Sequence, residues 1–267
     1  MIKFSIITVC LNAGEDLIYT VNDVLDQTYD NYELIVKDGF SKDGSVEQLP
    51  IDTRIKFIQQ KDIGIYDAMN HGIDKATGDY LIFMNAGDCF YEKETLEKLA
   101  QKIGKSHKAL YYGHCYNESL NVYSNSPKQL TPFFCYRSMI CHQAMVFDRT
   151  YLQRKKYDCD YVVSADREIL LYTVMEAQVP TAYIPLVIAK YKGAGFCETE
   201  KNQKQIVDEN QRLRTKYFTM EQNKLYRFVI ALTLPKLRNK IAKNPKLVRG
   251  YKRIVGFVYG NKRGAEK

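Results

Sequence analysis

Polar side chains gather directly after an apolar run in the middle of the chain. Asn85-Ala-Gly-Asp88 follows Tyr80-Leu-Ile-Phe-Met84, a pattern typical of a buried strand. A carboxylate at the carboxyl end of a strand is well placed to hold a divalent cation against phosphate oxygens. Asn, Gly and Asp also form turns, so the segment alone is equally compatible with a plain turn.

A second polar segment lies between two apolar runs. Asp62, Asp67 and Asn70 stand at the start of a helix-length stretch that ends near Lys75. The stretch is compatible with a capped helix in which Asp62 is the cap. The density of polar groups favours ligand contact instead.

A third candidate is a helix start in the second half. Asp166 and Glu168 lie in the first turn of a helix predicted at 164–175, where acids also interact favourably with the helix dipole. His142 stands at the start of a strand predicted at 141–147. A lone histidine is more often a hydrogen-bonded core group than a ligand, and no zinc set surrounds it in sequence.

The segments around these candidates alternate between strand and helix patterns. Predicted strands lie at 4–9, 32–37, 55–58, 80–84, 109–112 and 181–190, and predicted helices at 16–27, 65–75, 92–103 and 198–217. Alternating strands and helices indicate βαβ units and an α/β protein with a mostly parallel sheet.

Ligands of such sheets bind at the carboxyl ends of the strands. Polar residues follow the first, second and fourth strands, although they are scattered in sequence. We therefore expect them to converge on one crevice: Asn12, Asp38, Asp43, Asn85 and Asp88.

Composition limits the class of protein. The chain has 267 residues, of which 45% are hydrophobic and 26% charged. This excludes a largely disordered, collagen-like or multi-span membrane protein and leaves room for one large domain with an appendage. Seven cysteines without a C-x-x-C pair, and no recognisable signal peptide, favour a reducing cytosol over a disulfide framework.

The net charge of +8 is unevenly distributed. Residues 222–267 carry 13 Lys and Arg against one acid, a net +12, whereas residues 1–221 carry a net −4. The tail mixes basic and apolar residues, which suits a helix lying on an anionic membrane; a solvated helix packed on the body is the alternative. Its apolar stretch at 228–234 is too short to span a bilayer, and nucleic-acid binding is disfavoured because no recognition module is legible.

Several ordered motifs carry a family resemblance. They are Ser5-Ile-Ile-Thr8 with Asn12, the segment 37–45, the segment 62–72 and the segment 76–88. Together they resemble the nucleotide-sugar half of family 2 glycosyltransferases, closest to the bacterial branch that builds capsule, colanic acid and O-antigen chains. The resemblance covers about residues 3–218, with weaker support from the segments 141–143, 165–168 and 193–195.

The resemblance implies a GT-A fold, a nucleotide-diphosphate sugar donor with a UDP-sugar first among the candidates, a Mg²⁺ or Mn²⁺ ion, and inversion at the anomeric carbon. It places Thr8 and Asn12 where the first strand meets the nucleotide, and Asp38 where a carboxylate commonly binds the base or ribose. The loop and helix that flank the nucleotide would contribute Asp62, Asp67 and Asn70.

The metal motif departs from the family pattern. Asp88 takes the place of its last acid, while Asn85 and Gly87 stand where many relatives carry Asp. Mg²⁺ typically keeps several waters, so one carboxylate with diphosphate oxygens can still complete its shell. We expect weaker, more donor-dependent metal binding, with Asp88 as the ligand and Asn85 as a positioning residue.

The second half is expected to bind the acceptor and supply the base. Inverting transfer is a single displacement, so a carboxylate must take the proton of the attacking hydroxyl. By resemblance this base is Asp166, with Glu168 as the fallback, and His142 contacts the acceptor or the diphosphate. The loop 193–195 either closes over the donor or only connects two elements. Five tyrosines are candidates for an acceptor groove, although most tyrosines are packing groups: Tyr111, Tyr112, Tyr116, Tyr123 and Tyr136.

The expected organisation is a GT-A domain at 1–218, with a nucleotide-sugar half at 1–115 and an acceptor half at 116–218, followed by a basic helical tail at 219–267. The acceptor is expected to be a saccharide carried on a lipid at the inner leaflet of the plasma membrane, so the protein would be cytoplasmic and peripherally attached. The rival interpretations are a GT-A-like binding protein without catalysis, motivated by the thinned metal motif, and a basic-tailed nucleic-acid binder.

Overall fold

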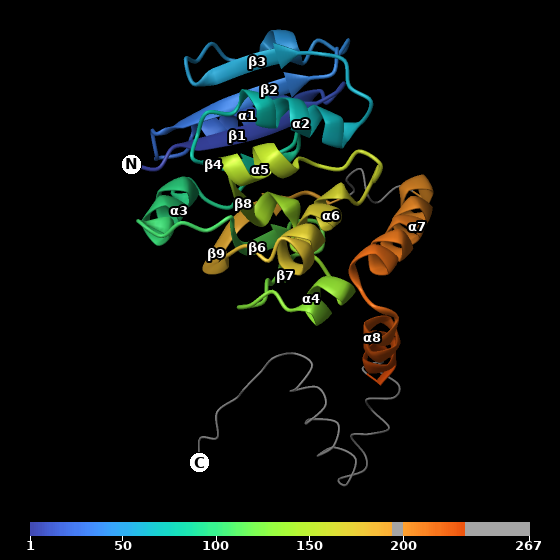
Figure 1. Ribbon diagram of the computed structural model, residues 1–267. Coiled ribbons are helices and arrows are strands. Elements are labelled where there is room, and N and C mark those ends of the chain that lie inside the picture. Colours follow the sequence, from blue (N-terminus) through green and yellow to red (C-terminus); the bar gives the residue numbers. More distant parts are fainter. Residues whose placement is uncertain (194–199, 233–267) are drawn as a thin grey trace.

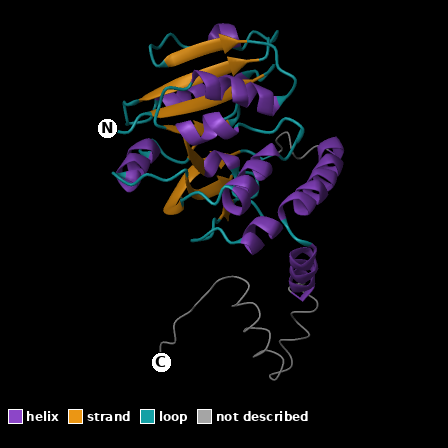
Figure 2. Cartoon of the chain, viewed as in Figure 1, coloured by secondary structure: helices purple, strands orange, loops and turns teal. Residues whose placement is uncertain are grey.

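The computed structural model describes residues 1–193 and 200–232 (Figure 1). Its strands form one nine-stranded sheet in the order β3-β2-β1-β4-β8-β6-β9-β5, with β7 paired to β6. Helices pack around this sheet, so the predicted α/β fold class is confirmed (Figure 2). The strands are β1 (Phe4–Cys10), β2 (Tyr32–Asp38), β3 (Ile55–Gln59), β4 (Tyr80–Phe83), β5 (Asp88–Phe90), β6 (Leu110–Asn117), β7 (Val122–Ser124), β8 (Met145–Asp148) and β9 (Thr181–Tyr191).

The first four strands of this order are parallel, and every residue of β1, β2 and β4 is buried. Burial on both faces explains the largely apolar sequences of β1 and β4, whereas β2 also buries the charged residues Glu33, Lys37 and Asp38. The amphipathic helices α1 (Glu15–Leu25) and α2 (Ile65–Lys75) pack their apolar faces against these strands. Gly72 lets α2 approach β1 closely, because a Cβ there would lie 2.5 Å from Cγ2 of Ile7.

The other half of the sheet is mixed. β8 runs antiparallel to both β4 and β6, and β5 and β7 are also antiparallel to their partners, whereas β6 and β9 are parallel. The mostly parallel arrangement predicted from sequence therefore holds for the N-terminal βαβ part only. The remaining helices are α3 (Thr95–Ile103), α4 (Pro132–Arg137), α5 (Arg149–Lys155), α6 (Ala165–Leu171), α7 (Glu200–Tyr217) and α8 (Met220–Leu232).

Two predicted elements begin later than expected. The helix predicted from residue 92 begins at Thr95, because Glu92 and Thr95 form a turn in which each backbone N–H bonds an oxygen of the other residue. The strand predicted from residue 141 begins at Met145, because His142–Ala144 form a turn of 3₁₀ helix. A short apolar run does not distinguish these two conformations.

The described part of the tail packs against the body. Tyr226 of α8 makes edge contacts with the rings of Phe133, Tyr136 and Phe218, and Val229 is buried. Residues 233–267, which carry most of the predicted basic tail, and Gly195 of the predicted 193–195 loop lie outside the described residues. None of the described helices is long and apolar enough to cross a membrane.

Candidate functional site

The turn after β4 presents Asp88 at the carboxyl edge of the sheet. Gly87 adopts a φ of 98°, which favours glycine and explains why a larger residue is absent there. The hydroxyl of Thr20 on α1 accepts a hydrogen bond from the backbone N–H of Gly87 at 2.9 Å and donates to the carbonyl of Asp88 at 2.7 Å. The turn is therefore held rigidly by a helix more than 60 residues away in sequence.

Asp88 is a largely buried carboxylate, with 13% of its side chain exposed and little compensating charge nearby. Its Oδ1 accepts a hydrogen bond from Nε2 of Gln143 at 3.0 Å, and burial raises its pKa to about 7 despite this bond. Among the described residues, its one ion-pair contact is with His142, 3.9 Å away. The buried Oδ1 of Asn85 has no hydrogen-bond partner in the described structure. A carboxylate oxygen and an unpaired amide oxygen, here in one turn, are the ligand types that Mg²⁺ and Mn²⁺ prefer.

Asp166 lies in the first turn of α6, and its carboxylate approaches the same His142 ring as Asp88; we call the region around these three residues the crevice. Its Oδ1 accepts hydrogen bonds from the backbone N–H of Arg167 at 2.8 Å and from the hydroxyl of Tyr66 at 3.1 Å. Burial outweighs these bonds and raises its pKa to about 6. Its Oδ2 lies 4.0 Å from Nδ1 of His142.

His142 stands between the two carboxylates. Its Nε2 lies 3.3 Å from Nδ2 of Asn85, and its two ring nitrogens face Asp88 and Asp166. Burial lowers its pKa to about 4, so the ring is neutral at physiological pH. The residue belongs to a 3₁₀ turn and not to the start of a strand, which corrects the position expected from sequence.

Asp38 and Asn12 shape the loops after β2 and β1. The carboxylate of Asp38 is buried and accepts hydrogen bonds from the backbone N–H groups of Phe40 and Ser41. Asn12 accepts one from the backbone N–H of Lys42 at 2.8 Å, and Asp43 accepts one from Gly14 at 2.7 Å. These bonds bring the two loops together.

The turn that carries Asp88 touches the same β1–α1 connection. The backbone N–H groups of Ala86 and Gly87 donate to the carbonyl oxygens of Val9 and Asp16. The segment from the end of β1 to the start of α1 therefore lies between the β2 loop and the Asp88 turn. The polar residues predicted to converge do lie at one edge of the sheet.

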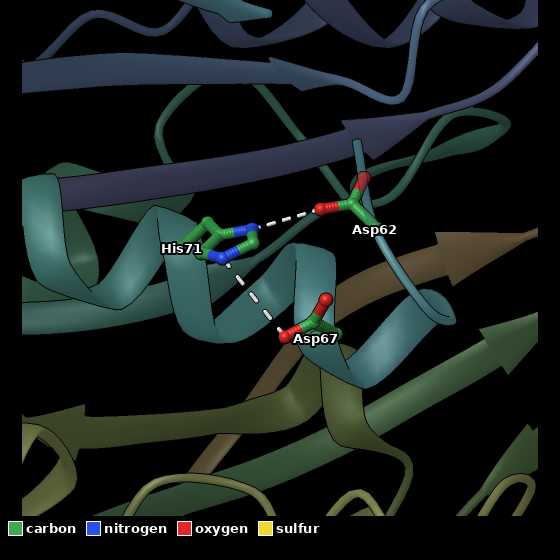
Figure 3. Close-up of side chains that lie close together, drawn as sticks. All are labelled: Asp62, Asp67 and His71. Atoms are coloured by element: carbon green, nitrogen blue, oxygen red, sulfur yellow. Dashed lines mark hydrogen bonds and ion pairs between the residues drawn. The ribbon is translucent and has the colours of Figure 1, made fainter. Parts of the chain in front are cut away.

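A further cluster lies at the start of α2 (Figure 3). His71 Nδ1 is 2.8 Å from Asp62 Oδ1, its Nε2 is 3.9 Å from Asp67 Oδ1, and ligand atoms of the three residues lie within 4.8 Å of one another. The other oxygen of Asp62 is bound at 2.6 Å by the fully buried ammonium of Lys37. This ammonium already compensates the charge of Asp62 and would repel a divalent cation, so the cluster fits a metal less well than Asp88 and Asn85.

Two predicted nucleotide contacts are placed differently from expectation. The side chain of Thr8 is completely buried in the sheet, away from the crevice surface. Asn70 uses its amide on the backbone of Tyr157, accepting from its N–H at 2.8 Å and donating to its carbonyl at 2.9 Å. Asn70 therefore connects α2 to the backbone at Tyr157, whereas the hydroxyl of Thr8 has no hydrogen-bond partner in the described structure.

The tyrosines predicted for an acceptor groove do not form one. Tyr111, Tyr112 and Tyr136 are at most 2% exposed and belong to the core. Tyr116 pairs with Tyr123 across β6 and β7, while the neighbouring pair, Cys115 and Ser124, faces Cys141 beside His142. Because side chains alternate along a strand, the two tyrosines lie on the opposite face from the crevice.

Glu168, the fallback base, is sequestered. Its carboxylate has no exposed surface and is bound by Lys155 at 2.9 Å, Lys216 at 2.9 Å and the hydroxyl of Tyr217 at 2.5 Å. Although burial alone would raise its pKa, these three partners lower it. Glu168 fastens α7 to α6 and has no free oxygen for an acceptor.

Thr20, Gln143 and Tyr66 were missed by sequence reasoning as supports of the crevice. Thr20 bonds the backbone of Asp88, Gln143 bonds its carboxylate and Tyr66 bonds the carboxylate of Asp166, each from a segment at least 55 residues away. Gln143 and Tyr66 lie inside the family motifs at 141–143 and 62–72, and this was the only sequence feature that could have pointed to them. Thr20 lies on a helix that carried no motif.

The comparisons with known proteins agree with this architecture. The profile of the family "Glycosyl transferase family 2" matches residues 5–170. A PGL/p-HBAD biosynthesis glycosyltransferase of Mycobacterium tuberculosis is 32% identical over 199 residues, which cover 72% of this chain and 77% of that protein. The chain therefore belongs to glycosyl transferase family 2, and it is a glycosyltransferase.

Solved structures share the fold. S. aureus TarS 1–349 in complex with UDP-GlcNAc has a TM-score of 0.58 at 14% identity, covering 96% of this chain and 80% of that chain. The mannosyltransferase PcManGT of Pyrobaculum calidifontis, in complex with GDP-Man and Mn²⁺, has a TM-score of 0.55 at 12% identity, covering 94% and 86%. A longer chain of S. aureus TarS has also been solved, and this protein spans 50% of its length. These likenesses concern the fold, and the expected GT-A fold is confirmed.

Proposed function

We propose that this protein transfers a sugar, with inversion, from a UDP-sugar to a hydroxyl of a saccharide acceptor, using Mg²⁺ or Mn²⁺. The observation that carries the proposal is the pairing of two buried carboxylates across His142. Asp88 lies 3.9 Å and Asp166 4.0 Å from opposite nitrogens of this ring. Two acids with raised pKa values in one crevice match the two roles that inverting transfer needs, a metal ligand and a base.

Asp88 and Asn85 are the proposed ion-binding residues. When bound, the ion would stabilise the negative charge that develops on the leaving diphosphate. The carboxylate oxygen of Asp88 and the unpartnered Oδ1 of Asn85 supply the oxygen ligands. This gives Asn85 a direct role in place of the purely positioning role expected from sequence. Thr20 and Gln143 keep the turn in place through the hydrogen bonds described above.

Asp166 is the proposed base, and its Oδ2 is the atom that accepts the proton. The acceptor oxygen forms a bond to the anomeric carbon while the bond from that carbon to the diphosphate oxygen breaks, and the hydroxyl proton passes to Oδ2. Oδ1 already accepts hydrogen bonds from the backbone N–H of Arg167 and the hydroxyl of Tyr66, so Oδ2 is the oxygen that remains for the proton. The neutral His142 ring lies between this base and the metal ligand and is the proposed contact to the diphosphate or the acceptor.

The donor nucleotide is proposed to bind over the loops after β1 and β2 and the start of α2. Asn12, Asp38, Asp62 and Asp67 line or brace this edge of the sheet. The complex of a fold relative with UDP-GlcNAc supports uracil as the base, although another relative binds GDP-Man. Asp62 and Asp38 hold their loops through buried hydrogen bonds, so their proposed contribution is the shape of the nucleotide pocket.

The acceptor is proposed to be lipid-linked and presented at the cytoplasmic face of the membrane. The name of the 32% identical relative from Mycobacterium tuberculosis refers to PGL/p-HBAD biosynthesis. On α8, Met220, Leu225 and Phe228 are 70%, 48% and 60% exposed, beside the basic Lys224 and Arg227. An exposed apolar and basic helix is suited to an anionic headgroup layer. Cosedimentation with vesicles containing anionic lipid, lost at high salt, is the expected behaviour.

A two-stage experiment tests the function. Nucleotide sugars are first screened by thermal shift with and without Mn²⁺, because a ligand of the folded state raises its apparent stability. The stabilising donor is then incubated with saccharide acceptors, and the anomeric configuration of the product is read by NMR. A donor that binds with Mn²⁺ and yields inverted product is expected. A donor that binds but is never transferred or hydrolysed would support the non-catalytic rival.

A further inference from the structure

We propose that Tyr66 is the positioning residue of the base, directing the incoming proton to Oδ2 of Asp166 and stabilising the ionised carboxylate. This inference rests on the proposed role of Asp166 and extends it to a residue on another helix. Its basis is that the hydroxyl of Tyr66 lies 3.1 Å from Oδ1 of Asp166 and 3.0 Å from the carbonyl oxygen of Val163.

The hydroxyl of Tyr66 has one proton for two acceptors. When Asp166 is ionised, donation to Oδ1 stabilises the negative charge, because a hydrogen bond to a charged acceptor is stronger than one to a carbonyl. Once Oδ2 has taken the acceptor proton, the carboxyl is neutral and the carbonyl of Val163 becomes a comparable acceptor. Tyr66 therefore remains hydrogen-bonded in both protonation states of the base, so neither state leaves a buried hydroxyl unpaired.

The position of Val163 is itself fixed by α7. Glu209, which is 1% exposed, accepts hydrogen bonds from the backbone N–H of Val162 at 2.8 Å and from that of Val163 at 3.1 Å. The carbonyl that Tyr66 uses is therefore not free to move. Tyr66 lies on α2, Val163 lies shortly before α6 and Glu209 lies on α7; Figure 1 shows how these three helices are arranged.

The other groups near Asp166 do not replace Tyr66. The guanidinium of Arg167 turns away and donates to the carbonyl oxygens of Cys135 and Tyr136. His142, with its pKa lowered by burial, faces Oδ2 as a neutral ring. The remaining titratable neighbours, Tyr157 and Cys141, interact with Asp166 only through space. Within residues 1–193 and 200–232, Tyr66 is thus the side chain that hydrogen-bonds the carboxylate.

The test is the pH dependence of sugar transfer by the full chain with Mn²⁺. Tyr66→Phe removes the donor, so the acidic limb of the rate profile should move upward by about one pH unit. Replacement of Tyr66 by 3-fluorotyrosine, a stronger donor of the same shape, should move the limb in the opposite direction. This second variant keeps the test valid if Tyr66→Phe folds poorly.

Tyr157→Phe is the matched control. The ring of Tyr157 lies 5.3 Å from that of Tyr66, but its buried hydroxyl has no hydrogen-bond partner in the described structure. Its removal should leave the limb in place. If both Tyr66 variants keep the parent profile while Asp166→Asn is inactive, Tyr66 is only a packing residue and the inference is wrong. If Asp166→Asn is as active as the parent, the proposed base itself is wrong.

Discussion

Two pairs of buried carboxylates in this protein behave in opposite ways. Asp88 and Asp166 in the crevice have little compensating charge, and burial raises their pKa values to about 7 and 6. Glu33 and Glu168 are at least as deeply buried. For Glu33, burial is outweighed by hydrogen bonds from Lys56, Ser5 and Thr77, which lower the pKa to about 2.

The difference separates stabilising acids from reactive ones. Glu33 and Glu168 tie distant elements together through lysines and hydroxyls, so their charge is stabilised within the fold. Asp88 and Asp166 keep an oxygen directed at the crevice. There a cation or a proton can neutralise the negative charge that the protein leaves uncompensated. Helix α6 contains one acid of each kind, only two residues apart, which makes it the most direct place to test this contrast.

The largest expected effect is on transfer by Asp166→Asn. The amide keeps the shape of the side chain but takes no proton, so the rate should fall by about 10²–10⁴ while donor affinity stays near that of the parent. Steady-state transfer and donor calorimetry on the same preparation measure the two quantities. Transfer at the parent rate would place the base elsewhere.

The acidic limb of the parent enzyme should reflect the raised pKa of Asp166. Because only the ionised carboxylate accepts a proton, transfer should be lost as the pH falls below about 6, roughly tenfold per pH unit. A profile measured at saturating donor and Mn²⁺ gives the midpoint. An acidic limb near pH 4, the ordinary range of an aspartate, would show that burial does not control this group.

Glu168→Gln should reduce stability while leaving the chemistry of the base in place. The substitution weakens hydrogen bonds from Lys155, Lys216 and Tyr217, and a loss of about 2 kcal/mol is expected, allowing for the partial exposure of Lys216. The folded-state pKa is lowered, so this stabilisation is present at neutral pH and is lost as the pH falls below the ordinary glutamate range. Denaturant unfolding measures it, and the exposed Glu176→Gln serves as the control.

The smallest expected effect is a gain in stability for Asp88→Asn in the absence of metal. Because the folded-state pKa is raised to about 7, the carboxylate of Asp88 favours the folded state at low pH and disfavours it as the pH rises through 7. The neutral amide removes this penalty, so at pH 8 the melting temperature should rise by about 2–4 °C. At pH 5 the difference should shrink, and an equal gain at both pH values would contradict the electrostatic explanation.

The sequence predicted this contrast only in part. The strand ends were sufficient to place Asp88 at one edge of the sheet, because parallel βαβ units bring their carboxyl ends together. Asp166, at the start of a helix in the second half, was assigned by the family resemblance. The supports from Thr20, Gln143 and Tyr66 depend on the packing of distant elements, which spacing along the chain does not determine.

Two other misjudgements have a local cause. The register of β6 against β9 shifts twice between Tyr112 and Cys115, with the additional residues in β9, so the neighbours of the later β6 side chains were not readable from the sequence. The 3₁₀ turn His142–Ala144 runs directly into the strand Met145–Asp148 with no glycine or proline between them, so no residue type marks where the turn ends. Both features are backbone irregularities that cannot be predicted from residue types alone.

The most direct test of the account is calorimetric binding of the identified nucleotide sugar, with and without Mn²⁺, to the parent, Asp88→Asn and Asp166→Asn. The account predicts that Mn²⁺ strengthens donor binding to the parent and to Asp166→Asn, and that this strengthening disappears in Asp88→Asn while its melting curve remains cooperative. Undiminished Mn²⁺-dependent binding by Asp88→Asn would contradict the assignment of the metal to this crevice.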